Sequence, residues 1–184
     1  MKVLVTGGAG YIGSHTVVEL INAGHQAIIV DDLSNAKADV VDRIETITGE
    51  RPAFFQLDCK DKEGLRSVFA AHKIDAIIHF AGIYMLDSLV ELENRDFEKI
   101  FAVNVQGAFL VNRTFLPLLG EGSRILLTTS ELAPLDPLPF TGIYAVTKGA
   151  LDKYAYSLRM ELQLLGIGVS VLRAGAVATG MLGV

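Results

Sequence analysis

The chain opens with a short apolar run that leads directly into a glycine-rich turn. Residues 2–5 favour a strand, Thr6-Gly7-Gly8-Ala9-Gly10-Tyr11-Ile12-Gly13 forms the turn, and residues 14–23 have the apolar periodicity of a helix. In such a unit the first glycine permits the tight turn, the second lets the backbone approach a pyrophosphate, and the third allows close packing of helix and strand. The spacing therefore predicts a dinucleotide site whose phosphates lie at the helix N-terminus.

A second apolar run, residues 27–30, ends in Asp31, which lies 18 residues after Gly13. A carboxylate at this spacing accepts hydrogen bonds from both hydroxyls of an adenosine ribose and repels a 2′-phosphate, so it favours NAD over NADP. A helix-capping role is the alternative, because another aspartate and a serine follow. We favour the ribose role because of the distance from the glycines. Asp58, after the third apolar run, is equally suited to meet the adenine edge and to form a turn.

Strand-like and helix-like segments alternate strictly along the chain. The strand-like runs are residues 2–6, 26–31, 53–57, 76–80, 124–128 and 169–172. This alternation predicts a parallel sheet with right-handed crossovers and helices on both faces. We therefore expect an α/β fold of the Rossmann type, a doubly wound parallel sheet of six strands in the order 3-2-1-4-5-6, within one dinucleotide-binding domain over residues 1–184. In residues 83–95, Asp87 and Ser88 are candidate helix caps.

Composition narrows the class of protein. The net charge of −5 without a basic stripe argues against nucleic-acid binding, and the absence of an apolar run of membrane-spanning length argues against a membrane protein. The single cysteine, Cys59, forms no internal disulfide and favours a reducing, cytoplasmic setting, where we expect it as a small buried hydrophobe. The four histidines lack metal-ligand spacing, so we expect no metal site.

Tyr144 and Lys148 are the leading catalytic candidates. Residues at i and i+4 share a helix face, so a phenol and an ammonium converge on one site. An apolar stripe continues from them through Leu151, Ala155, Leu158 and Leu162, which places Lys148 on the face that packs against the sheet. A phenol with a pKa of about 10 is a poor base at neutral pH. We expect the Lys148 charge to be nearly sufficient to lower that pKa toward neutrality.

Two polar residues complete the catalytic candidates. Ser130, 14 residues before Tyr144 and just beyond the fifth strand-like run, is placed to hydrogen-bond a substrate oxygen. A polar turn at a strand end is the alternative for Ser130. Asn104 lies within an otherwise apolar helix, where it either satisfies a backbone kink or holds a water that relays protons to Lys148.

Together these residues resemble the short-chain dehydrogenase/reductase superfamily over essentially the whole chain. Residues 1–82, with the segments TGGAGYIGSH, VDDLSNA and IIHFAG, resemble the N-terminal part of UDP-glucose (UDP-galactose) 4-epimerases. Residues 84–182, with NVQGAFL, YAVTK and RAGAVAT, are similar to the simpler alcohol dehydrogenase and ketoacyl reductase branch. The sequence thus resembles two branches, with a junction near residues 82–84.

The resemblance implies a role for each matching residue. Ser130 would donate to the substrate oxygen, Tyr144 would be the general acid/base, Lys148 would lower its pKa and bind the nicotinamide ribose, Asn104 would relay protons, and Thr179 would contact the nicotinamide carboxamide. The expected NAD-binding residues are Gly7, Gly10, Tyr11, Ile12, Gly13, Asp31, Asp58, Cys59, Phe80, Ala81, Gly82, Tyr144, Lys148 and Thr179.

The sequence departs from the family pattern at several places. Phe80 stands where the dehydrogenase branch usually has Asn, Ala174 where it usually has Pro, and the loop from Ser130 to Tyr144 is one residue longer than typical. Both branches normally continue beyond the position of Val184 into the segment that closes over the substrate. We therefore expect a recombinant or truncated chain.

Three functions remain open. The leading one is an NAD-dependent oxidoreductase that transfers hydride between nicotinamide and a small secondary alcohol or ketone. The second is a UDP-sugar 4-epimerase or a fragment of one, and the third is an NAD-binding module with little or no activity.

A homodimer is expected, because the predicted helices 96–119 and 142–166 carry apolar residues on more than one face, namely Phe101, Phe109, Leu110, Phe115, Tyr154 and Met160.

Overall fold

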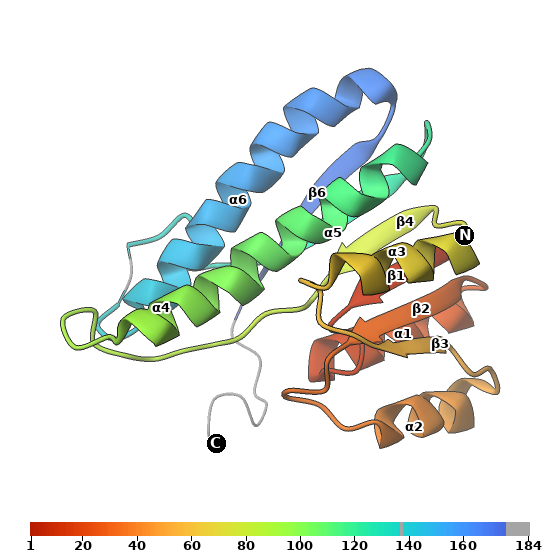
Figure 1. The fold of residues 1–184 in the computed structure, drawn as a ribbon, viewed down its shortest axis with the longest axis horizontal. Coiled ribbons are helices and arrows are strands. Elements are labelled where there is room, and N and C mark those ends of the chain that lie inside the picture. The colour runs from red at the N-terminus through yellow and green to blue at the C-terminus, as the bar shows by residue number, and fades with distance from the viewer. Residues whose placement is uncertain (137, 176–184) are drawn as a thin grey trace.

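Six parallel strands lie side by side in the order β3-β2-β1-β4-β5-β6, and helices flank both faces of the sheet (Figure 1). The computed structural model describes residues 1–136 and 138–175. The strands are β1 (Lys2–Thr6), β2 (Gln26–Asp31), β3 (Ala53–Gln56), β4 (Ala76–His79), β5 (Arg124–Ser130) and β6 (Gly168–Ala174). The α-helices are α1 (Tyr11–Asn22), α2 (Asp39–Thr48), α3 (Lys62–Ala71), α4 (Asn94–Phe101), α5 (Ala108–Phe115) and α6 (Gly142–Leu162). The strand order and the parallel pairing confirm the Rossmann-type fold expected from the sequence.

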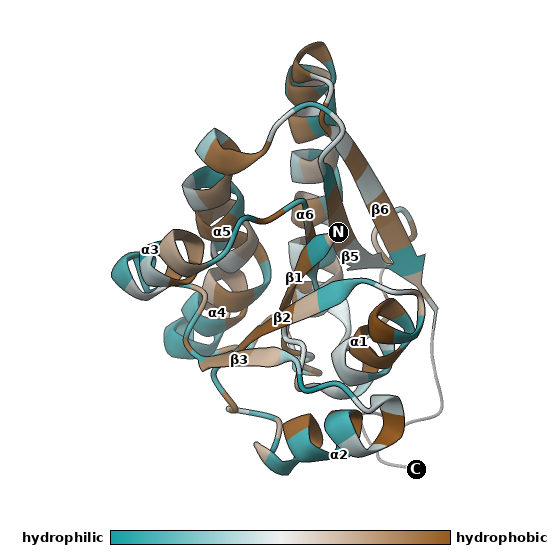
Figure 2. Ribbon diagram, turned by 90° about the vertical axis from the view of Figure 1, so that its right-hand side faces the viewer, coloured by the Kyte–Doolittle hydropathy of each residue, from teal (hydrophilic) through white to brown (hydrophobic). Residues whose placement is uncertain are grey.

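The inner strands are apolar on both faces because helices cover both. Leu4 and Ile77 belong to a core that they share with α3, α5 and α6. Val3 and Val5, which point the other way along β1, belong to a second core with α1 and α2. Figure 2 shows the strands largely brown, whereas the helices mix brown and teal. The sheet is thus held from both sides, which fixes the carboxyl ends of its strands in space.

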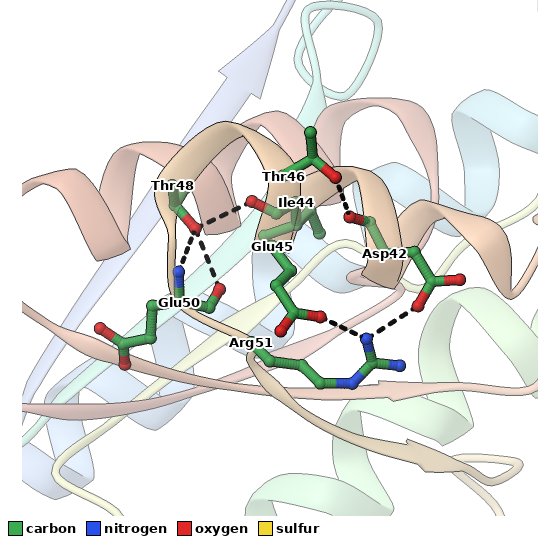
Figure 3. A network of polar contacts seen from close by, with 7 residues as sticks. All are labelled: Asp42, Ile44, Glu45, Thr46, Thr48, Glu50 and Arg51. Atoms are coloured by element: carbon green, nitrogen blue, oxygen red, sulfur yellow. Dashed lines mark hydrogen bonds and ion pairs between the residues drawn. The ribbon is translucent and has the colours of Figure 1, made fainter.

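A surface network ties the end of α2 to the start of β3 (Figure 3). The Arg51 guanidinium donates to the carboxylates of Asp42, at 2.8 Å, and Glu45, at 2.5 Å. The Thr48 hydroxyl, in the last turn of α2, donates to the carbonyl of Ile44 at 2.8 Å. Since these groups are exposed, the network orients the connection more than it stabilises the fold.

The long helix predicted over residues 96–119 is interrupted. A π-helical segment, Ala102–Gly107, separates α4 from α5, and a 3-10 turn, Leu116–Leu118, follows. Asn104 lies buried inside the π segment. The interpretation of Asn104 as a residue at a backbone irregularity is therefore supported, since π segments insert an extra residue into a helical turn.

Other boundaries differ from the expectations at strand ends and loops. Ser130 is the last residue of β5, not a residue beyond the strand. The expectation that Asp87 and Ser88 cap a helix is wrong, because the next helix, α4, begins at Asn94 after a turn at residues 89–91. The predicted helix 142–166 continues beyond α6 as a 3-10 turn, Gln163–Leu165.

Candidate functional site

A cleft of about 610 Å³ runs along the carboxyl ends of the strands. Its walls include the predicted residues Gly7, Gly10, Tyr11, Ile12, Gly13, Asp31, Asp58, Cys59, Phe80, Ala81, Gly82, Ser130, Tyr144 and Lys148. Asn104 lies outside the wall, one layer behind it. Thr179 lies outside the described residues. The structure therefore gathers residues from the ends of all six strands of the sheet, and from α1 and α6, around one space.

The glycines of the first turn are required by close backbone approaches. Gly7 has φ +68°, and a methyl group there would lie 2.5 Å from the Ala81 nitrogen. At Gly13 a methyl group would lie 2.1 Å from the Gly7 carbonyl oxygen, so the start of α1 fits only a glycine. Gly10 directly precedes α1 and faces the cleft. The N-terminal amides of α1 are therefore open toward the cleft, as a phosphate site requires.

Asp31 ends β2 and is 8% exposed. Its two carboxylate oxygens accept hydrogen bonds from the backbone nitrogens of Ala9, at 3.0 Å, and Leu33, at 2.9 Å. The carboxylate thus braces the glycine turn and still borders the cleft. A carboxylate oxygen has room for more than one hydrogen bond, so these contacts are compatible with a ribose role.

Asp58 and Cys59 follow β3. The Asp58 carboxylate accepts from the Lys60 nitrogen at 2.8 Å and pairs with the Lys60 ammonium at 3.3 Å. The turn role considered for Asp58 is therefore present, and the residue also lines the cleft. Burial, with the nearby negative charges of Asp58 and Asp31, raises the pKa of the Cys59 thiol to about 12. Cys59 is a partly buried side chain packed on the core, as expected, and not a thiolate nucleophile.

Ser130 and Tyr144 lie at the opposite end of the cleft, together with Lys148. Ser130 ends β5, whereas the other two lie on successive turns of α6. The Lys148 ammonium donates to the Thr128 carbonyl at 3.1 Å and lies 5.7 Å from the centre of the Tyr144 ring. Lys148 is only 6% exposed, which confirms that it lies on the buried face of the helix.

The electrostatics of this pair differ from the expectation. Burial raises the pKa of the Tyr144 phenol, an effect that the neighbouring Ser130 hydroxyl opposes and that Tyr84 reinforces. Burial also lowers the pKa of the Lys148 ammonium to about 8. The pKa of the phenol therefore moves upward, opposite to the direction expected from the Lys148 charge, and burial is the main cause.

Asn104 connects three parts of the site. Its side-chain oxygen accepts from the Ile83 nitrogen at 2.8 Å, and its side-chain nitrogen donates to the Ile83 carbonyl at 3.0 Å. The same nitrogen donates to the Thr147 hydroxyl at 3.1 Å, and that hydroxyl donates to the Tyr144 carbonyl at 2.8 Å. Asn104 therefore joins the π segment to the chain after β4 and to the helix that carries Tyr144.

Sequence reasoning missed several residues at the same end of the cleft. Tyr84 packs edge-on against Tyr144, with the ring centres 4.7 Å apart. Ile83, Glu131 and Leu132 complete the nearby wall. Only the position of Tyr84, a short way after the end of β4 at His79, hinted at this placement, since functional residues gather at such ends.

A second missed feature is a buried polar chain centred on His79. Its Nε2 lies 2.8 Å from the Asn112 side-chain oxygen, and its Nδ1 lies 3.3 Å from the Thr6 hydroxyl. The Asn112 amide donates onward to the Tyr154 hydroxyl at 3.2 Å. Burial lowers the pKa of His79 to about 4, so it is neutral at physiological pH.

Among residues 1–136 and 138–175, the structure forms no group of three or more acidic, histidine or cysteine side chains that could hold a metal.

The sequence pattern described as short chain dehydrogenase matches residues 1–184. The chain belongs to this family. The sequence of this short-chain dehydrogenase is also similar to those of curated epimerases. The UDP-glucose 4-epimerase of Bacillus subtilis (strain 168) is 36% identical over 161 residues, which are 83% of this chain and 46% of that protein. The chain thus spans less than half the length of this relative.

Solved structures of a dehydrogenase/reductase and of an epimerase share the fold of this chain. A dehydrogenase/reductase from Sinorhizobium meliloti 1021 superposes with a TM-score of 0.86 at 29% identity, covering 98% of this chain and 73% of that one. A UDP-glucose-4-epimerase from Stenotrophomonas maltophila, solved with bound NAD and formylated UDP-arabinopyranose, gives a TM-score of 0.76 at 33% identity, covering 94% of this chain and 52% of that one. The fold is therefore shared with a dehydrogenase/reductase and with an epimerase, and the sequence likeness to UDP-glucose 4-epimerase extends over 83% of the chain. In the part of this short-chain dehydrogenase that the structure describes, no helix combines the length and apolarity needed to cross a membrane.

Proposed function

We propose that the chain is an NAD-dependent oxidoreductase that transfers hydride between nicotinamide and a small secondary alcohol or ketone. The observation that carries this proposal is the convergence of Ser130, Tyr144 and Lys148 at one end of a cleft whose other end carries Asp31. Asp31 ends β2 and Ser130 ends β5. These two residues are separated because β2 and β5 lie on opposite sides of β1 in the sheet. A dinucleotide needs an elongated site of this kind.

The cleft residues fit NAD. The turn after β1 leaves no room for a side chain at Gly7 or Gly13 and brings the start of α1 to the cleft, where a pyrophosphate would lie. Asp31 would accept the adenosine ribose hydroxyls and repel a 2′-phosphate. Asp58 and Cys59 would border the adenine, and residues 80–82 would lie along the middle of the cofactor.

In the proposed reaction NAD, when bound, supplies the hydride acceptor or donor. The side chains of the protein would position the substrate and transfer the proton. Ser130 would hold the substrate oxygen by a hydrogen bond, and the Tyr144 oxygen would exchange the proton with it. Lys148 would hold the nicotinamide ribose and, when protonated, favour the ionised phenol. Asn104 would keep the chain after β4 and the Tyr144 turn of α6 in register, and a proton relay through it would reach Lys148.

A UDP-sugar 4-epimerase is the second candidate, because a curated relative with that activity is 36% identical over 161 residues. The same Tyr144 and Lys148 would serve an epimerase, which retains NAD and returns the hydride to the other face of the sugar. The reacting end of the cleft favours the dehydrogenase, since it has apolar walls at Ile83, Tyr84 and Leu132. We propose further that a junction between the two kinds of sequence lies near residues 82–84 of a single dinucleotide-binding domain.

A homodimer and a reducing, cytoplasmic setting belong to the same proposal. Of the apolar residues expected on the outer faces, Phe109 is 40% and Met160 47% exposed, whereas Leu110 is buried and Phe115 belongs to the sheet core. Phe97 and Tyr156 add to the exposed apolar surface of α4 and α6. Pairing of these helices with a second copy would cover that surface. Sedimentation that shows only monomer at micromolar concentration would contradict the dimer.

The activity is tested on purified protein of confirmed mass. An absorbance scan detects retained nicotinamide, and steady-state assays follow NADH formation from secondary alcohols and epimerisation of UDP-galactose. The proposal expects NADH formation from an alcohol. UDP-galactose epimerisation without alcohol oxidation would select the second candidate, and NAD binding without either reaction would indicate a binding module.

A further inference from the structure

A closed circuit of contacts joins the segment after β4 to the first turns of α6. The Asn104 side chain binds both backbone groups of Ile83, at 2.8 and 3.0 Å. The same side chain donates to the Thr147 hydroxyl at 3.1 Å, and that hydroxyl donates to the Tyr144 carbonyl at 2.8 Å. Asn104 therefore fixes both the residue that precedes Tyr84 and the helical turn that carries Tyr144.

Two further contacts hold the segment beyond Tyr84 against the start of α6. The Asp87 nitrogen donates to the Phe140 carbonyl at 2.9 Å. The Leu89 side chain packs so closely that a methyl group at Gly142 would lie 2.7 Å from it. The backbone is thus anchored on both sides of Tyr84, which sets the place of its ring.

The ring of Tyr84 closes the circuit. It meets the Tyr144 ring edge-on, with an interplanar angle of 77° and the centres 4.7 Å apart. Aromatic pairs favour this geometry, because the positive edge of one ring faces the negative face of the other. The Ser130 hydroxyl on β5 hydrogen-bonds the phenol, and the Lys148 ammonium on α6 lies 5.7 Å from the centre of its ring. The Tyr144 side chain is therefore contacted from three elements.

Both rings are half-buried, and both line the cleft. Tyr84 therefore covers one side of the Tyr144 phenol, while the side that borders the cleft stays open. Proton exchange requires the phenol oxygen to lie within hydrogen-bond reach of the substrate oxygen, and small misplacements of reacting groups are costly. A side chain that limits the movement of the Tyr144 ring would thus act on turnover without exchanging a proton itself.

From this circuit we infer that Tyr84 is a positioning residue for Tyr144, whose ring keeps the phenol oxygen beside Ser130 and excludes water from one side of the phenol. This inference deepens the proposed function and rests on it.

The kinetic test uses NAD and 2-propanol, whose methyl substituents lose little contact when the Tyr84 side chain is shortened. Tyr84→Ala should lower kcat about 3- to 10-fold and change KM by less than about twofold. Tyr84→Phe keeps the ring and should restore kcat to within about twofold of the parent chain, whereas Tyr84→Leu lacks the aromatic edge and should resemble Tyr84→Ala. A loss confined to KM, or a Tyr84→Leu chain as active as Tyr84→Phe, would overturn the positioning role.

Leu86→Ala is the matched control, because Leu86 lies on the same segment, is 57% exposed and does not line the cleft. It should leave kcat and KM unchanged. Urea unfolding of each variant shows whether it is folded under the assay conditions. If Tyr84→Ala does not fold, the comparison of Tyr84→Leu with Tyr84→Phe decides the question. An equal loss of kcat in Leu86→Ala would mean that the segment as a whole, and not the Tyr84 ring, controls turnover.

NMR tests the role of Tyr84 without turnover, so it also applies to a chain that binds NAD but oxidises no alcohol and thereby fails the proposed function. The five tyrosines are labelled with ¹³C at the ring carbon that bears the hydroxyl, and Tyr144→Phe identifies the Tyr144 signal. Burial raises the pKa of the Tyr144 phenol. Because Tyr84→Ala admits water to that phenol, its titration midpoint should move to lower pH. Tyr84→Phe and Leu86→Ala should keep the parent midpoint, and an unchanged midpoint in Tyr84→Ala would overturn the inference.

Discussion

The side chain of Asn104 holds Ile83 by both of its polar atoms, across 21 residues of sequence, at 2.8 and 3.0 Å. Asn104 is 1% exposed, so its loss would leave the part-buried polar groups of the Ile83 backbone without these partners. We predict that Asn104→Ala lowers the free energy of unfolding by about 1–3 kcal/mol. Urea unfolding measures this change. A variant as stable as the parent chain would show that these bonds are replaced by water.

Tyr144→Phe should lower any measured turnover by about 10²- to 10⁴-fold, because only the oxygen that exchanges the proton is removed. Calorimetry should show NAD affinity close to that of the parent chain. Lys148→Met should weaken both NAD binding and turnover, since it would remove a ribose ligand as well as a charge near the phenol. Full activity in Tyr144→Phe would refute the assignment of Tyr144.

The preference for NAD over NADP should depend on the charge of Asp31. One Asp31 oxygen also braces the glycine turn through Ala9, and the other holds the loop after β2 through Leu33, so Asp31→Ala would loosen both as well as remove the charge. Asp31→Asn removes the charge and keeps the shape. We predict tighter NAD binding in the parent chain and a smaller difference in Asp31→Asn, measured by calorimetry with both cofactors. Equal affinity of the parent chain for both would disprove the ribose role.

Acid should destabilise the protein through His79. Burial lowers the pKa of His79 to about 4 in the folded state, against about 6.5 in the unfolded chain. Between these values the unfolded state binds more protons, so this contribution to stability is full above pH 6.5 and is lost as the pH falls toward 4. The loss amounts to roughly 3 kcal/mol.

Urea unfolding at several pH values, compared between the parent chain and His79→Gln, isolates this contribution. The difference in unfolding free energy between the two chains should change between pH 6.5 and 4. A constant difference over that window would mean that His79 titrates normally in the folded state.

The order of the strands and the glycine turn followed from local sequence. Apolar runs alternating with helical segments leave few topologies other than a doubly wound sheet, and glycine is required at Gly7 because its backbone has φ +68°. The positions of Asp31, Ser130, Tyr144 and Lys148 at strand ends and on α6 were predictable for the same reason. Each is set by its distance along the chain from an element that hydrophobic periodicity reveals.

The tertiary structure decided which distant residues are in contact and how burial shifts their pKa values. The contact of Tyr84 with Tyr144 joins residues 60 positions apart, and the tether of Asn104 arises where the helix becomes a π segment, a change that apolar periodicity did not reveal. The pKa of Tyr144 depends on the balance of burial against neighbouring charge, and burial raises it although Lys148 is one helical turn away. Desolvation depends on every atom packed around a group, so sequence spacing determined which side chains share a site, and only packing determined their chemistry.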